Sequence, residues 1–401
     1  MFYPKLTQRA SSFYSCYLRM RPFFELKEKV NMKIKKSIVL SFVFLFSFSS
    51  PAFAEIDLDI QTMNASKAAT RAGNGERGPA LAVLKNGNLI LGGGNNGGTL
   101  FLGDGQKRAL IQLGELIAPG DRQKDSRFAI TDIAVLSEGT NSAKLLVSYP
   151  RLGAGKKCVE VVVDQVDANF RTNKIVKNKT WFVSKPCVPI KAVQHAAGRM
   201  ERIDANSVYL TIGDLGFTKI NDVKARGDLG SVFQLTETSV KKISTGHRNA
   251  QGIVLLANKA LLISEHGPRG GDEINVIKPN KDYGWPFVTF GKPYTSSDYV
   301  KPSKTGAHNG YEKPVKYWVP SIAPTELVQL PDNWGKYSKQ LVMGTLREES
   351  LVFMTMNAKN EIISEERVEV GERIRDLDID ENRSIVATTD SGKIMVIKLT
   401  K

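Results

Sequence analysis

One pattern of paired strands recurs along the chain and constrains the fold more than any other feature. Each copy has an apolar strand, a polar turn of Asn or Asp type, and a second apolar strand that ends in a polar residue or glycine. Four clear copies cover residues 81–93, 200–214, 253–267 and 377–390, and two weaker copies cover 130–150 and 323–346. The six units begin near residues 79, 130, 198, 251, 323 and 374, at uneven intervals of about 50 to 75 residues.

Repeats of this length built from short strands are typical of a β-propeller. A blade of three or four strands cannot bury both of its faces alone, so neighbouring blades must stack. We therefore predict an all-β, six-bladed β-propeller; the strand pattern leaves open a β-sandwich or two separate β domains. The last unit ends after three strands, and residues 55–63 alternate between polar and apolar. This segment is expected to supply the missing outer strand and close the ring.

The N-terminal segment has the features of an export signal. Residues 32–54 contain a basic start, an eleven-residue apolar run from Ile38 to Phe48, and an A-x-A pattern that ends at Ala54. The run is too short to span the roughly 30 Å of hydrocarbon in a bilayer, so we expect cleavage near Ala54 and no stable membrane span. Residues 1–31 are interpreted as a mis-assigned extension. The propeller domain, residues 55–401, is then expected to be periplasmic or secreted.

Charge and cysteine content limit the other classes of function. Of the formal net charge of +15, +7 belongs to residues 1–54 and +8 to the rest of the 401-residue chain. A mildly basic domain without a clustered stripe of basic and aromatic residues gives no specific signal for nucleic acid. Cys16 lies in the leader, which leaves Cys158 and Cys187 as an even pair in an oxidising compartment. We therefore expect one disulfide.

Three motifs in the middle of the chain give a specific resemblance. They read GHRNAQG at 246–252, EHGPRGGDEIN at 265–275 and DYGWP at 282–286. This string closely resembles the soluble aldose sugar dehydrogenases that depend on pyrroloquinoline quinone (PQQ), the glucose/sorbosone dehydrogenase family. Asp282 stands where the family has asparagine, and weaker similarity extends over most of residues 125–400. The family is a secreted six-bladed propeller, in agreement with the leader and the repeats.

The resemblance implies a quinoprotein that oxidises the anomeric carbon of aldoses to lactones and passes electrons to an external acceptor. It implies that His195, in QHAAGR at 194–199, takes the proton of the anomeric hydroxyl while hydride passes to PQQ. Imidazole titrates near neutrality, which suits a general base. PQQ has three carboxylates, which arginine guanidinium groups can bind. The cofactor-binding residues implied by the resemblance are Arg248, Asn249, Tyr294, Arg347, Arg373 and Arg375.

The resemblance also implies calcium, a hard cation that prefers oxygen ligands. The backbone carbonyls of Gly267 and Pro268 are expected to hold the ion that clamps the quinone. Glu273 and Tyr283 match a second calcium position in the family, the first by its carboxylate and the second by its carbonyl. From the residues alone, Asp272 and Glu273 are also compatible with a turn cap.

The arginine pair in residues 371–376 leaves the function open. The alternation of Arg373 and Arg375 suits carboxylate binding, but it also suits ordinary salt bridges to Glu372 or Asp376. A non-catalytic, calcium-binding propeller that binds a sugar or a protein partner is therefore the alternative function. The joint presence of the expected base and several expected cofactor residues favours the enzyme.

Three positions depart from the family pattern near the expected site. No glutamine aligns in residues 124–129, Ala197 replaces a glycine, and Glu326 stands in the family's P-S-G segment. A carboxylate at position 326 would repel the cofactor's carboxylates unless an arginine lies between them. The cofactor site therefore requires a compensating cation near Glu326.

Overall fold

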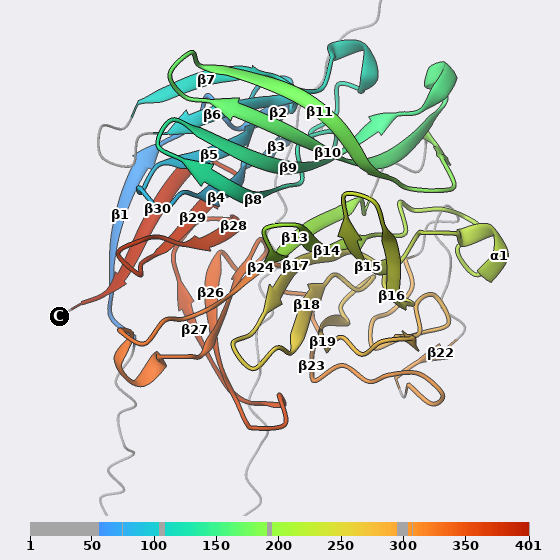
Figure 1. Ribbon diagram of the computed structural model, residues 1–401. Coiled ribbons are helices and arrows are strands. Elements are labelled where there is room, and N and C mark those ends of the chain that lie inside the picture. The colour runs from blue at the N-terminus through green and yellow to red at the C-terminus, as the bar shows by residue number, and fades with distance from the viewer. Residues whose placement is uncertain are drawn as a thin grey trace, which may run out of the picture. The chain divides into compact units, whose positions relative to one another are not determined.

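Short strands separated by polar turns dominate the chain, and they pair into six mainly antiparallel sheets (Figure 1). The computed structural model describes residues 56–73, 75–103, 109–190, 195–294, 304–306 and 308–400. Each sheet has four or five strands and forms one blade of a propeller. The predicted all-β, six-bladed β-propeller is confirmed, and each predicted strand pair forms the first two strands of a blade.

The first three blades follow one another along the chain. Blade 1 contains β4 (Ala80–Val83), β5 (Leu89–Gly93), β6 (Thr99–Gly103) and β7 (Leu110–Glu115). Blade 2 contains β8 (Asp132–Gly139), β9 (Ser142–Leu152), β10 (Cys158–Asn169), β11 (Lys174–Val183) and β12 (Val188–Pro189). Blade 3 contains β13 (Ala197–Asp204), β14 (Ser207–Ile212), β15 (Ser231–Thr236), β16 (Val240–Thr245) and β20 (Lys281–Asp282).

The other three blades complete the ring. Blade 4 contains β17 (Ala250–Leu255), β18 (Leu261–Glu265), β19 (Asp272–Val276) and β23 (Lys316–Trp318). Blade 5 contains β24 (Pro324–Gln329), β25 (Leu341–Thr345), β26 (Ser350–Met356) and β27 (Ile362–Glu369). Blade 6 contains β28 (Ile374–Ile379), β29 (Ile385–Thr389), β30 (Lys393–Leu399) and β1 (Leu58–Asn64).

A few small elements lie outside the blades. Strand β2 (Thr70–Ala72) pairs with β3 (Gly75–Arg77), and β21 (Val288–Thr289) pairs with β22 (Lys304–Thr305). Short 3-10 helices cover Pro119–Asp121, Ala154–Lys156 and Gly335–Tyr337. The part of the chain that the structure describes has one short α-helix, α1 (Val223–Arg226), which Asp222 caps by accepting two backbone N–H groups.

The first strand of the domain closes the ring, as predicted for residues 55–63. Strand β1 pairs antiparallel with β30 along its whole length, from Leu58 opposite Leu399 to Asn64 opposite Lys393. The innermost strands contact one another in the order β4, β8, β13, β17, β24 and β28, and β28 contacts β4. The closing strand therefore covers the edge that β30 would otherwise expose.

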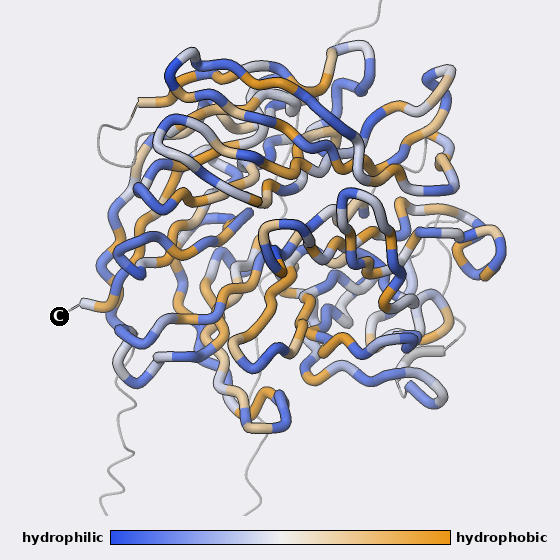
Figure 2. Tube along the Cα trace, viewed as in Figure 1, coloured by the Kyte–Doolittle hydropathy of each residue, from blue (hydrophilic) through white to orange (hydrophobic). Residues whose placement is uncertain are grey.

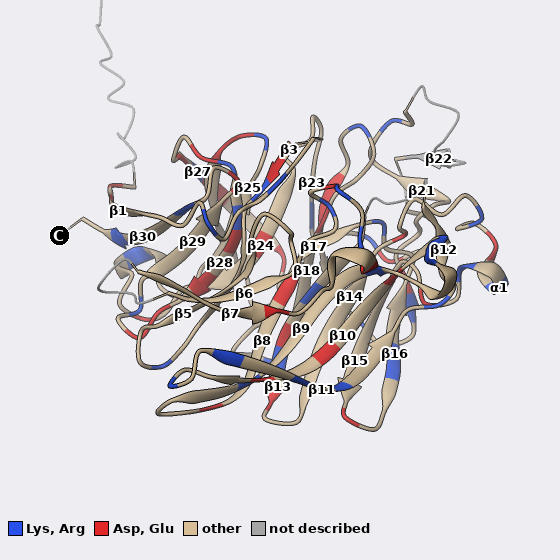
Figure 3. Ribbon diagram, turned by 90° about the horizontal axis from the view of Figure 1, so that it is seen from above, with Lys and Arg blue, Asp and Glu red and all other residues tan. Residues whose placement is uncertain are grey.

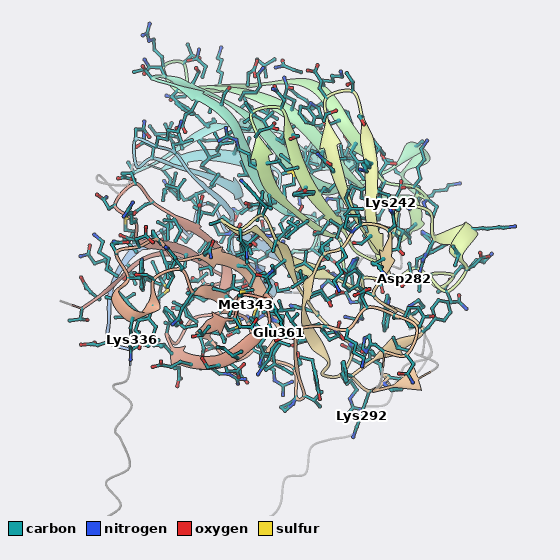
Figure 4. The ribbon with its side chains drawn as sticks, turned by 60° about the horizontal axis from the view of Figure 1, so that its bottom comes forward. Lys242, Asp282, Lys292, Lys336, Met343 and Glu361 are labelled. Carbon is teal, nitrogen blue, oxygen red and sulfur yellow. A yellow bond between two sulfur atoms is a disulfide. The ribbon has the colours of Figure 1, made fainter. Side chains whose placement is uncertain are left out.

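Apolar side chains fill the space between neighbouring blades. Blades 2 and 3, for example, enclose a cluster that includes Val161, Phe182 and Phe233. Figure 2 shows the apolar residues concentrated along the strands and the hydrophilic ones at many of the turns. Met343 of β25 is fully buried, whereas Lys292 is exposed (Figure 4). Each fully buried large side chain contributes about 1.5–3 kcal/mol, so contact between blades supplies much of the stability.

The predicted disulfide is present: Cys158, at the start of β10, is bonded to Cys187, just before β12. The leader, residues 1–54, lies outside the described residues, so its cleavage stays a prediction. Across the described ranges, no helix is both long enough and apolar enough to cross a membrane.

Carboxylates in the channel join the innermost strands of neighbouring blades. Asp376 accepts the backbone N–H of Leu81 at 2.9 Å, and Asp132 accepts that of Met200 at 2.5 Å. Asp378 accepts the N–H of Val83 at 2.8 Å in the same way. Figure 3 shows acidic residues along β24 and β28 of this inner ring. These bonds supply acceptors to inner strands whose channel-side edges have no sheet partner.

Arg199, in β13, lies buried among these carboxylates. Its guanidinium donates to Glu326 and Asp376, which come from blades 5 and 6. It also donates to the backbone carbonyl of Thr131 at 2.8 Å, next to blade 2. One cation therefore links four blades at the channel.

The carboxylates of the inner ring make stability depend on pH, and the half-buried Glu201 gives a specific prediction. Burial raises the pKa of Glu201 to about 8 against an opposing hydrogen bond from the Leu255 N–H, with nearby Asp378 raising it further. The folded state therefore keeps a proton that the unfolded chain loses between about pH 4.5 and 8, so stability falls as pH rises through this window. We expect Glu201→Gln to reduce this loss of stability with rising pH.

Thermal unfolding at pH 5 and pH 8 measures the effect. The difference in melting temperature between the two pH values should be smaller in Glu201→Gln than in the wild type. The exposed Glu361→Gln is the control and should match the wild type. An unchanged pH dependence in Glu201→Gln would contradict this account of the channel.

Candidate active site

Residues at the starts of the innermost strands converge on one pocket of about 220 Å³. Thr131 directly precedes β8, His195 lies just before β13, and Asn249 directly precedes β17. Arg375, the second residue of β28, and Arg77, at the end of β3, line the same pocket. The register of β13, β17, β24 and β28 is broken at their starts. Such irregularities change the direction in which side chains point, and here they lie at the mouth of the channel.

His195 is held as a neutral imidazole with a defined orientation. Its Nδ1 donates to Asp214 Oδ1 at 2.7 Å, and its Nε2 accepts from the Arg248 guanidinium at 3.1 Å. Asp214 also accepts from the Trp285 indole N–H at 2.8 Å, which fixes the carboxylate. The side chain of His195 is 13% exposed and lines the pocket. This is the arrangement of a base and the group that orients it.

The electrostatics keep this base unprotonated. Burial lowers the pKa of His195, and the nearby Arg248 cation lowers it further, against the opposing effect of Asp214. Burial opposes the ionisation of Asp214, but His195 and Arg248 outweigh it and hold the pKa of this carboxyl below its usual value. His195 is therefore ready to accept a proton at neutral pH.

The backbone around the base has an unusual conformation. His195 has φ +55° and Ala197 has φ +53°, so both lie in the left-handed region that favours glycine. Ala197 is the position where the family pattern has glycine. Its methyl group is buried at the pocket, and the two residues hold a conformation that costs non-glycine residues about 1–2 kcal/mol each.

Arg248 connects the base to the loop expected to bind calcium. Its guanidinium donates to the carbonyls of His266 at 3.1 Å and Gly267 at 2.7 Å. It lies 5.3 Å from the ring centre of Trp285 and 5.9 Å from that of Tyr294. Its Nε is buried and has no hydrogen-bond partner within the described part of the chain. The side chain therefore has donor capacity left for a ligand.

The residues expected to bind calcium form a buried, oxygen-rich region. The carbonyl of Gly267 accepts from Arg248, and the carbonyl of Pro268 accepts from the Tyr294 hydroxyl at 3.0 Å. Tyr283 is buried, and its hydroxyl donates to the Val276 carbonyl at 2.6 Å. The hydroxyl of Tyr283 is thus engaged, as expected if only its carbonyl serves as a ligand.

Glu273 lies in this region beside a second buried carboxylate, Glu265. The Asn275 amide donates to Glu265 at 2.8 Å and to Glu273 at 3.2 Å. Burial and then the Glu265 charge raise the pKa of Glu273 well above its usual value. The Asn275 Oδ1 is buried without a partner in the described chain. Two carboxylates and an unpartnered amide oxygen suit a divalent cation.

Side chains alone do not complete this site. The described residues contain no group of three or more His, Cys, Asp or Glu side chains placed to hold a metal ion. Asp272 accepts the backbone N–H groups of Ile322 and Ala323, each at 2.8 Å, so it ties two loops together. A cation here would depend on backbone and amide oxygens as well as carboxylates.

The six predicted cofactor residues do not all line this pocket: Arg248 lines a smaller one with Gly267, Glu273 and Tyr283, and Tyr294 lines neither. Arg375 lines the pocket with His195 and Asn249. Arg347 is exposed just after β25, and Arg373 is half-exposed at the start of blade 6; neither lines the pocket. Their cofactor roles stay predictions.

The two arginines of blade 6 share one acceptor that the motif did not indicate. Arg375 forms a two-pronged salt bridge with Asp390, at 2.9 Å for each oxygen, and Arg373 also pairs with Asp390, at 3.0 Å. Neither pairs with Glu372 or Asp376, the partners considered from the sequence. Asp390 follows β29 and lies 15 residues from Arg375 in sequence, so spacing alone gave no signal for it.

Two departures from the family pattern have a structural explanation. Glu326 does not face the pocket as an unpaired carboxylate, because it is buried and paired with Arg199. The arginine that the sequence required is therefore present. In the segment without the glutamine, Ser126 and Arg127 line the pocket, and Gln251 adds an amide from the 246–252 motif.

The fold and the pocket define a class of protein: a six-bladed β-propeller with an oriented, neutral histidine and arginines at the mouth of its channel. The model of the glucose/sorbosone dehydrogenase family matches residues 80–397. The chain belongs to this family.

Individual relatives agree with this assignment. The chain is 32% identical to the aldose sugar dehydrogenase YliI of Escherichia coli over 290 residues, which are 68% of this chain and 76% of that protein. It is 31% identical to an uncharacterised Synechocystis protein over 158 residues, which are 39% of this chain and 38% of that protein.

Solved structures share the fold. The apo-form of the soluble aldose sugar dehydrogenase of E. coli superimposes with a TM-score of 0.71 at 23% identity, covering 85% of this chain and 99% of that one. The PQQ-bound aldose sugar dehydrogenase of Streptomyces coelicolor gives a TM-score of 0.61 at 20% identity, with the same coverage.

The environment of His195 predicts its titration. Its pKa should lie below the ordinary value of 6.5 because burial and Arg248 disfavour the imidazolium. Arg248→Gln should raise this pKa, and Asp214→Asn should lower it further, since each change removes one of the opposing charges. NMR titration of the ring signals measures all three values.

The four histidines of the chain make the assignment simple, because a His195→Gln variant identifies the missing signal. A wild-type pKa at or above 6.5, or shifts of the opposite sign in the two variants, would refute the electrostatic description of the site.

Proposed function

We propose that the protein is an exported, PQQ-dependent aldose sugar dehydrogenase that oxidises the anomeric carbon of aldoses to lactones. The observation that supports this most is the His195–Asp214 pair, which lies in the pocket lined by Asn249 and Arg375. The names of the E. coli and Streptomyces relatives support the same activity. PQQ, when bound, would supply the redox chemistry by accepting a hydride from the anomeric carbon.

His195 is the general base of the proposed reaction. Its Nε2 would take the proton of the anomeric hydroxyl once the substrate displaces the Arg248 N–H that Nε2 accepts in this structure, while Nδ1–H stays bonded to Asp214. The Asp214 carboxylate would offset the positive charge that forms on the imidazole, and Trp285 would keep that carboxylate in place. Loss of a hydride from carbon and a proton from oxygen converts the cyclic sugar into the lactone.

The residues present fit a planar ligand with several carboxylates. The Arg248 Nε is a buried donor without a partner in the described chain, and Arg375 faces the pocket with its position fixed by Asp390. Asn249 borders the same space. In this proposal Arg248, Asn249 and Arg375 hold the cofactor next to His195.

We propose calcium as the second cofactor. The unpartnered Asn275 Oδ1, the two carboxylates beside it and the carbonyls of Gly267 and Pro268 are oxygen donors of the kind that calcium prefers. Glu273 and the Tyr283 carbonyl would complete the second position. The ion would neutralise the repulsion between Glu265 and Glu273.

Reconstitution tests the function directly. Purified protein is loaded with PQQ and calcium, and reduction of a redox dye is followed with a panel of aldoses. We expect turnover that requires both cofactors. Bound PQQ without turnover on any aldose would instead favour the non-catalytic, sugar- or protein-binding propeller.

A single substitution tests the proposed base. His195→Ala should bind PQQ as the wild type does and lose at least about 100-fold in turnover, since general bases contribute 10²–10⁴-fold. Cofactor binding is measured by absorbance, turnover by dye reduction. Loss of both properties, or of neither, would argue against His195 as the base.

Export is a separate proposal that rests on the leader. Cleavage after Ala54 would give a mature protein that begins at Glu55, next to the first strand of the propeller. N-terminal sequencing of the protein secreted by an expression host is expected to read EIDLD. A start upstream of residue 32 in the exported protein would overturn this assignment.

A further inference from the structure

Arg77 is a pocket residue that neither the motifs nor the family pattern indicated. It ends β3, in the β2–β3 hairpin that precedes blade 1, and it lines the same pocket as His195. The next residue, Gly78, donates its N–H to Asp390 at 2.9 Å. A Cβ atom on Gly78 would lie 2.4 Å from the Thr389 oxygen. The chain after Arg77 is thus fixed against blade 6.

Asp390, the carboxylate that fixes Gly78, already accepts several hydrogen bonds. Asp390 Oδ1 accepts from Gly78 and Arg375, and Oδ2 accepts from Arg375 and Arg373. Among the residues described, Arg77 forms no salt bridge, and its buried Nε has no hydrogen-bond partner. Glu76, its neighbour, pairs instead with Arg71 at 3.1 Å. Among these residues, Arg77 therefore has no ion-pair partner of its own at the pocket wall, and Asp390 and Asp376 attract its charge only from a longer distance.

The surroundings of Arg77 disfavour its charged form. Burial, and then the charge of Arg375, lower the pKa of Arg77 to about 9. A half-buried guanidinium whose buried Nε has no partner destabilises the protein unless something else compensates it. Because the space in front of it is a ligand pocket, a negatively charged group of the ligand is the natural counter-ion.

We propose that Arg77 and Arg375 together bind a carboxylate of the pocket's ligand. The Arg77 guanidinium offers two parallel donors that match the two oxygens of a carboxylate. Arg375, whose Nε and one terminal nitrogen bind Asp390, would add its other terminal N–H group. This carboxylate has two possible sources: the PQQ cofactor, in which case the inference rests on the proposed function, or an acidic sugar such as a uronic acid. Arg77 is then a positioning or specificity residue rather than part of the chemistry.

The test compares Arg77→Gln, Arg77→Lys and the control Arg71→Gln with the wild type. Arg71 lies in the same hairpin, but its side chain is 53% exposed and does not line the pocket. PQQ affinity is measured by quenching of protein fluorescence in the presence of calcium. Binding of glucuronate and of glucose is measured by calorimetry on protein without PQQ. Thermal unfolding of the ligand-free proteins completes the set.

If the cofactor is the source, Arg77→Gln weakens PQQ binding about tenfold or more, because a charged hydrogen bond is lost. Arg77→Lys restores part of the affinity, and Arg71→Gln has none of these effects. If an acidic sugar is the source, PQQ affinity stays constant and the preference for glucuronate over glucose disappears. In both cases the ligand-free Arg77→Gln protein melts no lower than the wild type, since a half-buried charge without an ion-pair partner in the described chain is removed.

Two results would overturn the inference. One is unchanged affinity of Arg77→Gln for both PQQ and glucuronate. The other is a lower melting temperature of ligand-free Arg77→Gln with no rescue of affinity by lysine, which would make Arg77 structural. A wild-type protein that binds no PQQ would instead refute the proposed function, and the glucuronate measurements would still decide the role of Arg77.

Discussion

The buried ion cluster around Arg199 is the interaction on which the rest of the structure depends. Innermost strands of different blades do not pair into one sheet, so their relative heights have to be set by side chains. Arg199 donates to Glu326, Asp376 and the Thr131 carbonyl, and thus joins blades 2, 3, 5 and 6. Removing one partner from a buried ion pair typically costs about 3–5 kcal/mol, because the other charge is left unpaired.

The same cluster explains where the site forms. Thr131 lines the pocket and binds Arg199 with its carbonyl, so the ion cluster lies directly next to the pocket. With the inner strands held in register, their starts bring His195 and Arg375 to one end of the channel, where Arg77 of the β2–β3 hairpin also lies. Acidic side chains inside the ring accept hydrogen bonds and pair with Arg199. Arg77, which forms no ion pair among the described residues, lies at the mouth of the channel. This separation suits an anionic ligand.

The fold and several residues of the candidate site can be predicted from the sequence, because both leave signals in short stretches of the chain. Six strand pairs, a closing strand and two cysteines are visible without any tertiary information, and His195, Arg248 and Arg375 lie in short motifs. Asp214 and Asp390 gain their roles only through contacts that the folded chain creates. Arg77 lies outside the region of similarity, and its role appears only when blade 6 folds against the hairpin.

The alternation rule shows the limit of pattern reasoning at this site. It places Arg373 and Arg375 on one side of an extended strand, and both do reach Asp390. The register of β28 is broken between Ile374 and Asp376, however, so that only Arg375 enters the pocket. Such a break depends on the neighbouring strand and cannot be read from residue spacing.

A crystal structure of the protein with PQQ and calcium tests the central claim most directly. The account predicts density for the quinone in the pocket between His195 and Arg375, with the imidazole Nε2 facing the space left for the sugar. Density at another surface, or an empty pocket at saturating cofactor, would contradict the claim that the propeller assembles a quinone site at this end of its channel.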